Sequence, residues 1–266
     1  MYFNKIGIIG LGFVGGAIAS SFESSMTTIV TVDVDPNRAN GTYADLMDCE
    51  GVFVCVPSPM NSDMSCDTSI LESVLERLQN YQGVIISKCT APPNKYEELN
   101  KVYPNLVHNP EFLTAANAQT DYLNQKFAII GGSIRAYRHE AERIIKLSLP
   151  DLQQSFHCSI GEASLAKYAI NTFLATKVIY MNELQQLAVA SGLDYNKIIK
   201  MMQADERIGR SHLQVPGPDG SFGFGGACFP KDTVALLKYA ESLNIPLNVL
   251  DAAVKKNTLL RLTEPK

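Results

Sequence analysis

Short, strongly apolar segments recur along the first half of the chain, each with the length of a buried strand. The first, Lys5-Ile6-Gly7-Ile8-Ile9, is almost wholly apolar, which is typical of a central strand. Further strand candidates lie at residues 28–32, 52–56, 84–87, 106–108 and 127–130. Helical patterns separate several of them, at residues 16–22, 69–78, 93–99 and 134–147. This alternation predicts an α/β fold with a doubly wound parallel sheet.

The second half of the chain is dominated by helical patterns. Residues 161–191 contain no proline and no internal glycine, and they predict one helix of about 30 residues, roughly 45 Å long. That helix is apolar around most of its circumference, so we expect it to be buried against other helices or a second subunit. Further helical patterns lie at residues 195–203, 233–243 and 247–262. We therefore expect two domains, a sheet domain at residues 1–157 and a long helix with an all-helical domain at 158–266.

A glycine-rich turn, Gly10-Leu11-Gly12-Phe13-Val14-Gly15, joins the first strand to the first helix. Its first glycine permits a tight turn, its second lets backbone N–H groups approach a pyrophosphate, and its third lets the helix pack on the strand. Asp33 ends the second strand, where a carboxylate can bind the ribose 2′-hydroxyl of NAD. The pattern predicts a Rossmann-type, NAD-binding domain. Its candidate cofactor-binding residues are Gly10, Gly12, Phe13, Val14, Gly15 and Asp33.

Two alternatives stay open at this turn. The first is that residues 10–15 are only a glycine-rich connection between strand and helix, with no ligand bound. Arg38 is close enough in sequence to reach a 2′-phosphate, which would favour NADP, although it can equally stack on adenine or lie in solvent.

Three loops should meet at the carboxyl edge of the predicted sheet, where ligands of such folds bind. They are Pro57-Ser58-Pro59, Lys88-Cys89-Thr90-Ala91-Pro92 and Asn109-Pro110-Glu111-Phe112-Leu113. Thr90 offers a hydroxyl, and Glu111 offers a carboxylate that could act as a base or position a water. Alternatively, Thr90 caps a helix and Glu111 is a solvated loop acid.

Lys167 and Asn171 lie four residues apart on one face of the predicted long helix. Polar groups on a buried helix need partners, and a ligand would be one. Alternatively, Lys167 extends to solvent and Asn171 makes a local bond.

The segment from Phe222 to Asp232 concentrates further candidate chemistry. Three glycines in its first half leave bare backbone that can lie close to a ligand. Cys228 follows at the predicted start of a helix, one turn from Lys231, a setting that favours a thiolate nucleophile. The alternative is a buried cysteine after a loop, with Asp232 as an ordinary helix cap.

Composition narrows the function classes. The chain has 266 residues, 46% hydrophobic and 19% charged, with a net charge of −4 and no run of like charge. This argues against nucleic acid or an anionic membrane as the main partner. Six scattered cysteines, with no signal peptide in view, indicate reduced thiols in a cytoplasmic protein. The four histidines show no metal-ligand spacing, so no metal site is predicted. Lys177, Asn182 and Glu183 interrupt the long helix, so it should not span a membrane.

Six motifs, in order along nearly the whole chain, resemble the UDP-glucose/GDP-mannose dehydrogenases. These enzymes use NAD to oxidise a nucleotide sugar at C6 to the uronic acid. The matching stretches are Gly10–Gly15 with Asp33, Lys88-Cys89-Thr90, Asn109–Leu113, Lys167–Asn171, Arg207-Ile208-Gly209 and Gly225–Asp232.

The resemblance implies a covalent mechanism with Cys228 as nucleophile. A first hydride transfer gives an aldehyde, which the thiolate traps as a thiohemiacetal. A second NAD takes hydride to give a thioester, and water releases the acid. Lys167 would stabilise the oxyanion, with Asn171 and Asp232 as hydrogen-bonding partners. Glu111 would assist thioester hydrolysis.

The resemblance also implies binding roles. Thr90 would lie beside the reacting centre and the cofactor, with Lys231 also near the cofactor. Pro57, on its loop at the carboxyl edge of the sheet, is a further cofactor-binding candidate. Arg207 would reach the substrate from a neighbouring subunit, which implies a homodimer built on the long helix. The implied substrate-binding residues are Glu111, Phe112, Leu113, Lys167, Asn171, Arg207, Phe222, Phe224, Gly225 and Gly226.

Two departures from the family pattern bear on these expectations. Thr114-Ala115-Ala116 stands where the family usually has a second glutamate. The chain ends at Lys266, where the family usually continues into a third α/β domain that closes over the nucleotide. We therefore expect a short form, with a weak KM, a low kcat or a smaller substrate.

Two other functions remain open. One is a two-electron NAD-dependent dehydrogenase of the β-hydroxyacid type, which needs no thiol and yields one NADH per turnover. The other is a non-catalytic NAD-binding remnant that needs a partner chain.

Overall fold

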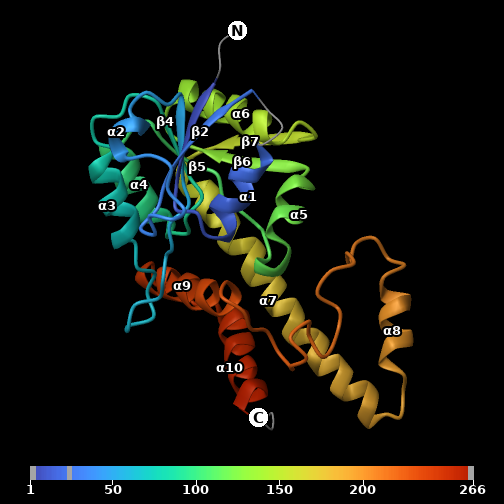
Figure 1. The fold of residues 1–266 in the computed structure, drawn as a ribbon. Coiled ribbons are helices and arrows are strands. Elements are labelled where there is room, and N and C mark those ends of the chain that lie inside the picture. Colours follow the sequence, from blue (N-terminus) through green and yellow to red (C-terminus); the bar gives the residue numbers. More distant parts are fainter. Residues whose placement is uncertain (1–3, 23–25, 263–266) are drawn as a thin grey trace. The chain divides into compact units, whose positions relative to one another are not determined.

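The computed structural model describes residues 4–22 and 26–262, which form two compact units (Figure 1). The first, here the sheet unit, comprises Met1–Asn61 and Cys66–Lys167. The second, here the helical unit, comprises Ser62–Ser65 and Tyr168–Lys266. Helix α7 (Ile160–Ala190) begins in the sheet unit and continues in the helical unit, as the uninterrupted run of helix formers predicts.

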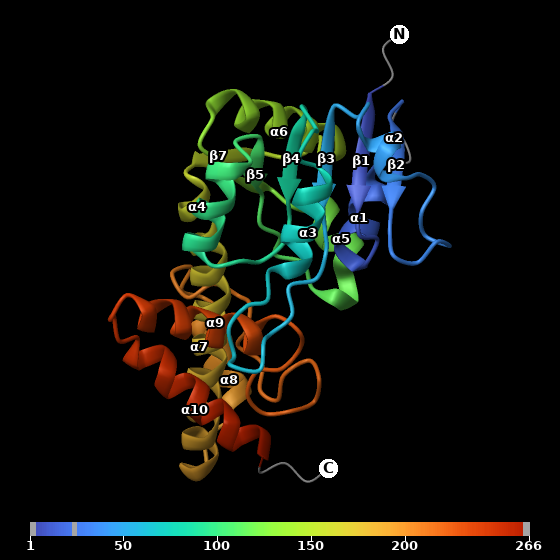
Figure 2. The same ribbon diagram turned by 90° about the vertical axis from the view of Figure 1, so that its left-hand side faces the viewer.

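The sheet unit is built on seven strands in the order β2-β1-β3-β4-β5-β6-β7. Figure 2 shows β2, β1, β3 and β4 side by side. All neighbouring pairs are parallel except β5 and β6, which are antiparallel. The strands are β1 (Lys5–Ile9), β2 (Thr28–Val32), β3 (Gly51–Val54), β4 (Val84–Ser87), β5 (Leu106–His108), β6 (Phe127–Gly131) and β7 (Gln154–Cys158).

This architecture confirms the predicted doubly wound sheet, with two differences. Contrary to the prediction, the sheet is not parallel throughout, because β6 runs antiparallel to β5. A strand covered on both faces is apolar whichever way it runs, so the sequence gives no sign of its direction. Strand β7 was missed because it lies at the edge of the sheet and its sequence, Gln-Ser-Phe-His-Cys, is mostly polar and partly exposed.

Helices cover both faces of the sheet, which explains the uninterrupted apolar strands. One face packs Ile6, Ile8 and Phe53 against three helices, and the opposite face packs Ile9 and Val52 against three others. The first three are α1 (Phe13–Ser21), α5 (Ala118–Leu123) and α6 (Arg135–Ser148); the others are α2 (Tyr43–Leu46), α3 (Ser69–Arg77) and α4 (Pro93–Val102). The short helices α2 and α5 were not predicted, since four and six residues give too little periodicity.

In the helical unit, α7 is followed by α8 (Tyr195–Met202), α9 (Phe229–Ser242) and α10 (Asn248–Leu262). Gly192 ends α7 with a φ of +68°, the conformation expected of a helix C-cap. Helix α9 begins four residues earlier than predicted, because Pro230 is compatible with a first helical turn. None of the helices in the described ranges is long and apolar enough to cross a membrane.

Candidate active site

The glycine turn between β1 and α1 has the shape that a dinucleotide needs. Gly10 has a φ of +86°, and a Cβ on Gly15 would lie 1.9 Å from the carbonyl oxygen of Gly10. Both positions therefore exclude any larger residue. A Cβ on Gly12 would meet nothing within 4 Å, so this part of the turn faces open space. The open backbone lies directly before α1, whose N-terminal N–H groups suit a phosphate.

Asp33, at the end of β2, is fixed against the same turn. Its carboxylate accepts hydrogen bonds from the backbone N–H of Leu11 at 2.6 Å and of Asp35 at 2.9 Å. These bonds hold the pKa of Asp33 below its usual range, so the carboxylate is an acceptor at neutral pH. Arg38 donates to the Leu11 carbonyl at 3.4 Å and lies 3.4 Å from Asp35. The turn and Asp33 thus fit a dinucleotide, with Arg38 beside them.

A buried lysine that the sequence analysis had not singled out lies just past the end of β4. Lys88 is buried, and its Nζ donates to Asn109 Oδ1 at 2.7 Å. Burial lowers the pKa of Lys88 to about 8. Both residues directly follow strands, which is the signal that could have identified them.

Glu111 and Lys167 form a buried ion pair in the sheet unit. Lys167 Nζ lies 3.1 Å from Glu111 Oε1 and also donates to the Glu111 backbone carbonyl. The second carboxylate oxygen accepts from the Leu113 N–H at 2.7 Å, and the Phe112 ring lies 5.1 Å from the ammonium. Lys167 therefore does not extend to solvent, and Glu111 is not a solvated loop acid. The pair places a positive charge and a carboxylate together in a site with little water.

A second polar cluster lies in the helical unit, where α9 begins. Asp232 is 1% exposed, and its two carboxylate oxygens accept from Asn171 Nδ2 and Lys231 Nζ, both at 2.6 Å. The Asp232 N–H donates to the backbone carbonyl of Cys228 at 2.8 Å, which closes the first turn of the helix. Cys228 is the half-buried N-cap residue, and among the described residues it forms no disulfide. The predicted helix-start position of the cysteine is therefore confirmed.

Helix α10 holds the glycine loop that precedes Cys228. Asn257 bonds both the N–H of Phe224, at 2.7 Å, and its carbonyl, at 3.1 Å. Arg261 lies 2.8 Å from Asp219 and donates to the Gly223 carbonyl at 3.3 Å. Sequence analysis missed both of these residues, because ordinary polar positions on a helix carry no local sign of a loop 33 or more residues away.

The loop itself presents backbone rather than aromatic rings. Phe224 is buried in a cluster with Ala175, Ile179 and Leu260, and Phe222 packs partly against the same cluster. A Cβ on Gly226, whose φ is +78°, would meet nothing within 4 Å.

Three other predicted site residues belong to neither of the two polar clusters. Pro57 is exposed and Thr90 half-buried on their loops in the sheet unit. Arg207 is exposed and pairs with its near neighbour Asp205 at 2.5 Å. Helix α7 carries Lys167 of the first cluster and Asn171 of the second, one turn apart.

Comparison with known protein families is consistent across both units. A model described as the UDP-glucose/GDP-mannose dehydrogenase family, NAD binding domain, matches residues 38–147. A second, described as the central domain of the same family, matches residues 161–259. The chain belongs to the UDP-glucose/GDP-mannose dehydrogenase family. This confirms the resemblance inferred from the motifs, and NAD as the cofactor of this fold.

One named relative is similar over almost the whole chain. The chain is 28% identical over 97% of its length to a UDP-glucose 6-dehydrogenase of Bacillus subtilis, TuaD, and spans 64% of that relative's own length.

Solved structures share the fold. A UDP-glucose dehydrogenase from Pyrobaculum islandicum superimposes with a TM-score of 0.83 at 24% identity, covering 97% of this chain and 68% of the other. The 3-hydroxyisobutyrate dehydrogenase of Mycobacterium tuberculosis superimposes with a TM-score of 0.75 at 15% identity, covering 98% and 95%. At such identities the likeness concerns the fold alone.

Proposed function

We propose that this member of the dehydrogenase family oxidises a nucleotide sugar at C6 to the uronic acid, with Cys228 as the covalent nucleophile. The observation that carries the proposal is the position of Cys228 at the start of α9, one turn before a buried Asp232 that is bonded to Asn171. Cys228 itself is the N-cap of α9, so Asp232 is not the helix cap. The bonds of Asp232 to Asn171 and Lys231 hold polar groups in fixed positions one turn from the thiol, as the surroundings of a nucleophile require.

The glycine turn and Asp33 would hold the cofactor, and bound NAD supplies a hydride acceptor, once for the alcohol and once for the thiohemiacetal. Between these transfers the Cys228 sulfur forms a bond to the aldehyde carbon, and the carbonyl oxygen becomes an alkoxide that takes a proton. The thiohemiacetal would then lose its hydroxyl proton to solvent together with the second hydride, which leaves a thioester, and water would displace the thiolate to release the acid. Four electrons leave the sugar in total, and two NADH form per acid.

Lys167 and Glu111 are suited to the charged steps of this reaction. The Lys167 ammonium can stabilise an oxyanion that develops on the substrate, and its burial strengthens that interaction. Glu111 keeps this ammonium in one place and is a carboxylate that can polarise the hydrolytic water. We propose that this pair and the Asn171–Asp232 pair serve the same reaction.

The backbone of the glycine loop is proposed to bind the sugar nucleotide. Asn257 and Arg261 fix its path, so its exposed glycines can lie against the substrate without an ordering cost at binding.

A panel of UDP- and GDP-sugars with NAD tests the proposal, with NADH and acid both counted. Two NADH per acid supports it. One NADH per turnover, without acid, indicates the two-electron activity of the β-hydroxyacid type, whose fold this chain shares. Normal NAD binding with no turnover on any sugar indicates a non-catalytic NAD-binding protein.

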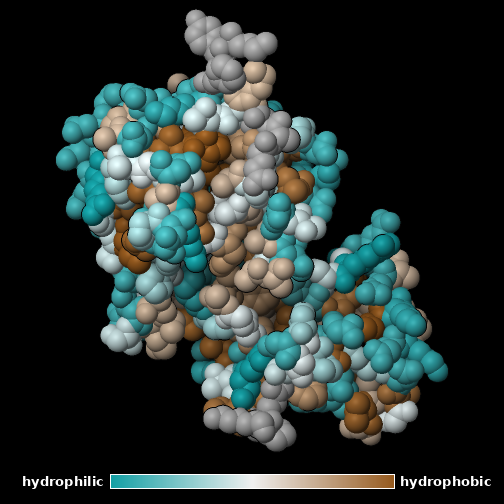
Figure 3. All heavy atoms as spheres, in the orientation of Figure 1, coloured by the Kyte–Doolittle hydropathy of each residue, from teal (hydrophilic) through white to brown (hydrophobic). Residues whose placement is uncertain are grey.

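We also propose a homodimer through α7. Phe173, Tyr180 and Leu187 recur every seven residues, which keeps them on one face of the helix, and all are exposed. Figure 3 shows hydrophobic atoms at the surface near the end of this helix. Sedimentation of the wild type and of Phe173→Glu tests this: a dimer that the substitution dissociates supports it, and a wild-type monomer at all concentrations contradicts it.

A further inference from the structure

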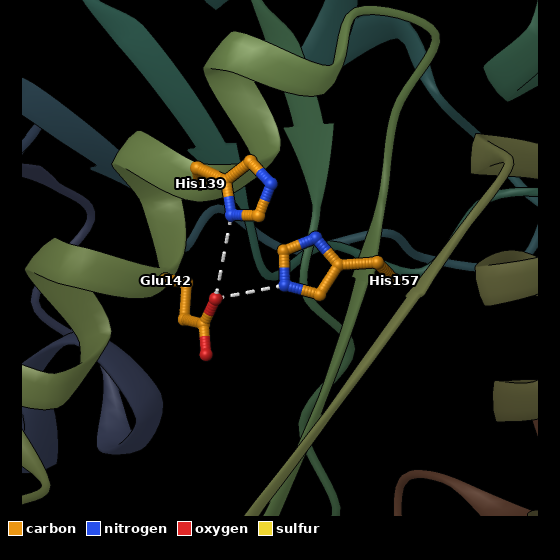
Figure 4. Close-up of side chains that lie close together, drawn as sticks. All are labelled: His139, Glu142 and His157. Carbon is orange, nitrogen blue, oxygen red and sulfur yellow. Dashed lines mark hydrogen bonds and ion pairs between the residues drawn. The ribbon is translucent and has the colours of Figure 1, made fainter.

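Two histidines and one glutamate meet at the edge of the sheet unit, among residues that the proposed reaction does not use (Figure 4). His139 and Glu142 lie one turn apart on α6, and His157 lies on the edge strand β7. Glu142 Oε2 is 2.8 Å from His157 Nε2 and 3.8 Å from His139 Nδ1. These three atoms all lie within 4.8 Å of one another.

We propose that His139, Glu142 and His157 bind a Zn²⁺-class divalent ion at the junction of α6 and β7. Two imidazoles and one carboxylate form a donor set that suits zinc, cobalt or nickel, whereas calcium and magnesium prefer oxygen ligands throughout. Three protein ligands leave one tetrahedral position, which water can take.

Lys146 pairs with one carboxylate oxygen of Glu142, and the other oxygen remains available to an ion. Lys146 Nζ lies 2.7 Å from Glu142 Oε1, whereas Oε2 is the oxygen that faces both histidines. The Lys146 bond is the largest cause that lowers the pKa of Glu142 to about 2, and the bond from His157 adds to it. Glu142 is therefore ionised at neutral pH, as a carboxylate ligand must be.

Metal binding requires the His139 ring to move toward the other two ligands. Zinc bonds of about 2.0–2.1 Å in a tetrahedron place ligand atoms about 3.3 Å apart. The Glu142–His157 atoms are slightly closer than this and the Glu142–His139 atoms slightly farther. The two histidine nitrogens lie within 4.8 Å of each other and must come closer. His139 is the most exposed of the three, with 53% of its side chain accessible, so it can turn without disturbing the core.

Arg135 provides a specific control. Its Nε donates to His139 Nε2 at 3.1 Å, and this bond favours the tautomer with the proton on Nδ1. Metal binding through Nδ1 needs the opposite tautomer. Removing Arg135 should therefore leave the metal affinity of the site unchanged or increase it. If the three residues form only ion pairs, neither the wild type nor this variant binds the metal.

Isothermal titration of the chelator-treated full chain with ZnCl₂ tests the site, with Co²⁺ absorption as a second readout. We expect one ion per chain with micromolar or tighter affinity. His139→Ala and His157→Ala should each weaken binding at least about tenfold, since even loss of a group that only orients a ligand costs about that much. Arg135→Ala should bind as tightly as wild type or more tightly, and so should His212→Ala, which removes an exposed histidine of the helical unit.

Three outcomes overturn the proposal. The first is a wild-type chain that binds no Zn²⁺ at micromolar concentrations. The second is unchanged binding in the His139→Ala/His157→Ala double variant. The third is an intense thiolate-to-cobalt charge-transfer band, which would show that cysteines hold the ion. His139→Ala removes an exposed side chain, and circular dichroism confirms that it folds.

Discussion

Replacing Glu111 with glutamine should destabilise the sheet unit strongly, because it leaves the Lys167 ammonium buried without its counter-charge. The two side chains are 9% and 4% exposed, and their charged atoms lie 3.1 Å apart. Their attraction at an effective dielectric constant near 20 is about 5 kcal/mol. The Glu111 backbone carbonyl still accepts from Lys167 after the substitution, so part of the interaction survives. We expect the free energy of unfolding to fall by about 3 kcal/mol, the lower end of the range for a broken buried pair.

Urea unfolding followed by circular dichroism and tyrosine fluorescence measures this change, since the chain has no tryptophan. The transition of the sheet unit must be identified first, because two units need not unfold together. Asp48→Asn is the matched control in the same unit. It removes the charge from a pair 3.8 Å apart in which the aspartate is 83% exposed, so it should cost less than about 1 kcal/mol.

A double variant sharpens the interpretation. Glu111→Gln/Lys167→Met removes both charges, so it should be more stable than Glu111→Gln alone. The reasoning is refuted if Glu111→Gln costs no more than the Asp48→Asn control, or if the second substitution only adds to the loss.

Three further predictions concern the cofactor turn, a buried histidine and the glycine loop. Gly12→Ala should leave the Tm unchanged but weaken NAD binding, whereas Gly15→Ala should unfold the turn and lower the Tm, as thermal scans with and without NAD will show. Burial lowers the pKa of His108 to about 3, so the unfolded chain binds the extra proton. The stabilising contribution of His108 is complete above pH 6.5 and is lost as the pH falls toward 3. Over that range the free energy of unfolding should fall by up to about 1.4 kcal/mol per pH unit. In His108→Asn, urea titrations should show a free energy of unfolding that lacks this part of the pH dependence. Asn257→Ala should cost about 1–3 kcal/mol, because it leaves the Phe224 N–H and carbonyl without a partner, and it should raise KM for the sugar nucleotide more than KM for NAD.

The strands and the glycine turn could be predicted because their signals are local. Burial on two faces shows directly as apolar runs such as residues 5–9, and Gly10 is required by its own backbone conformation. Strand β7 could not be predicted, since an edge position relaxes the demand for apolar residues.

Motif matching proposed several members of the candidate site but could not give their contacts. Motif matching identified Glu111 and Lys167, yet nothing in the sequence shows that they pair across 56 residues. The support of the glycine loop by Asn257 arises from the packing of α10 and has no local signature. The same is true of His157, which meets His139 only because β7 lies beside α6, so the spacing of histidines along the chain gave no indication of a metal site.

The role of Cys228 is tested most directly by counting NADH and acid formed from a UDP-sugar by the wild type and by Cys228→Ala. The wild type should give two NADH per acid, and rapid acid quenching should trap an acyl group on the peptide that contains Cys228. The variant should fold, bind NAD with wild-type affinity and form no acid. Acid formation by Cys228→Ala at two NADH per acid would contradict the account.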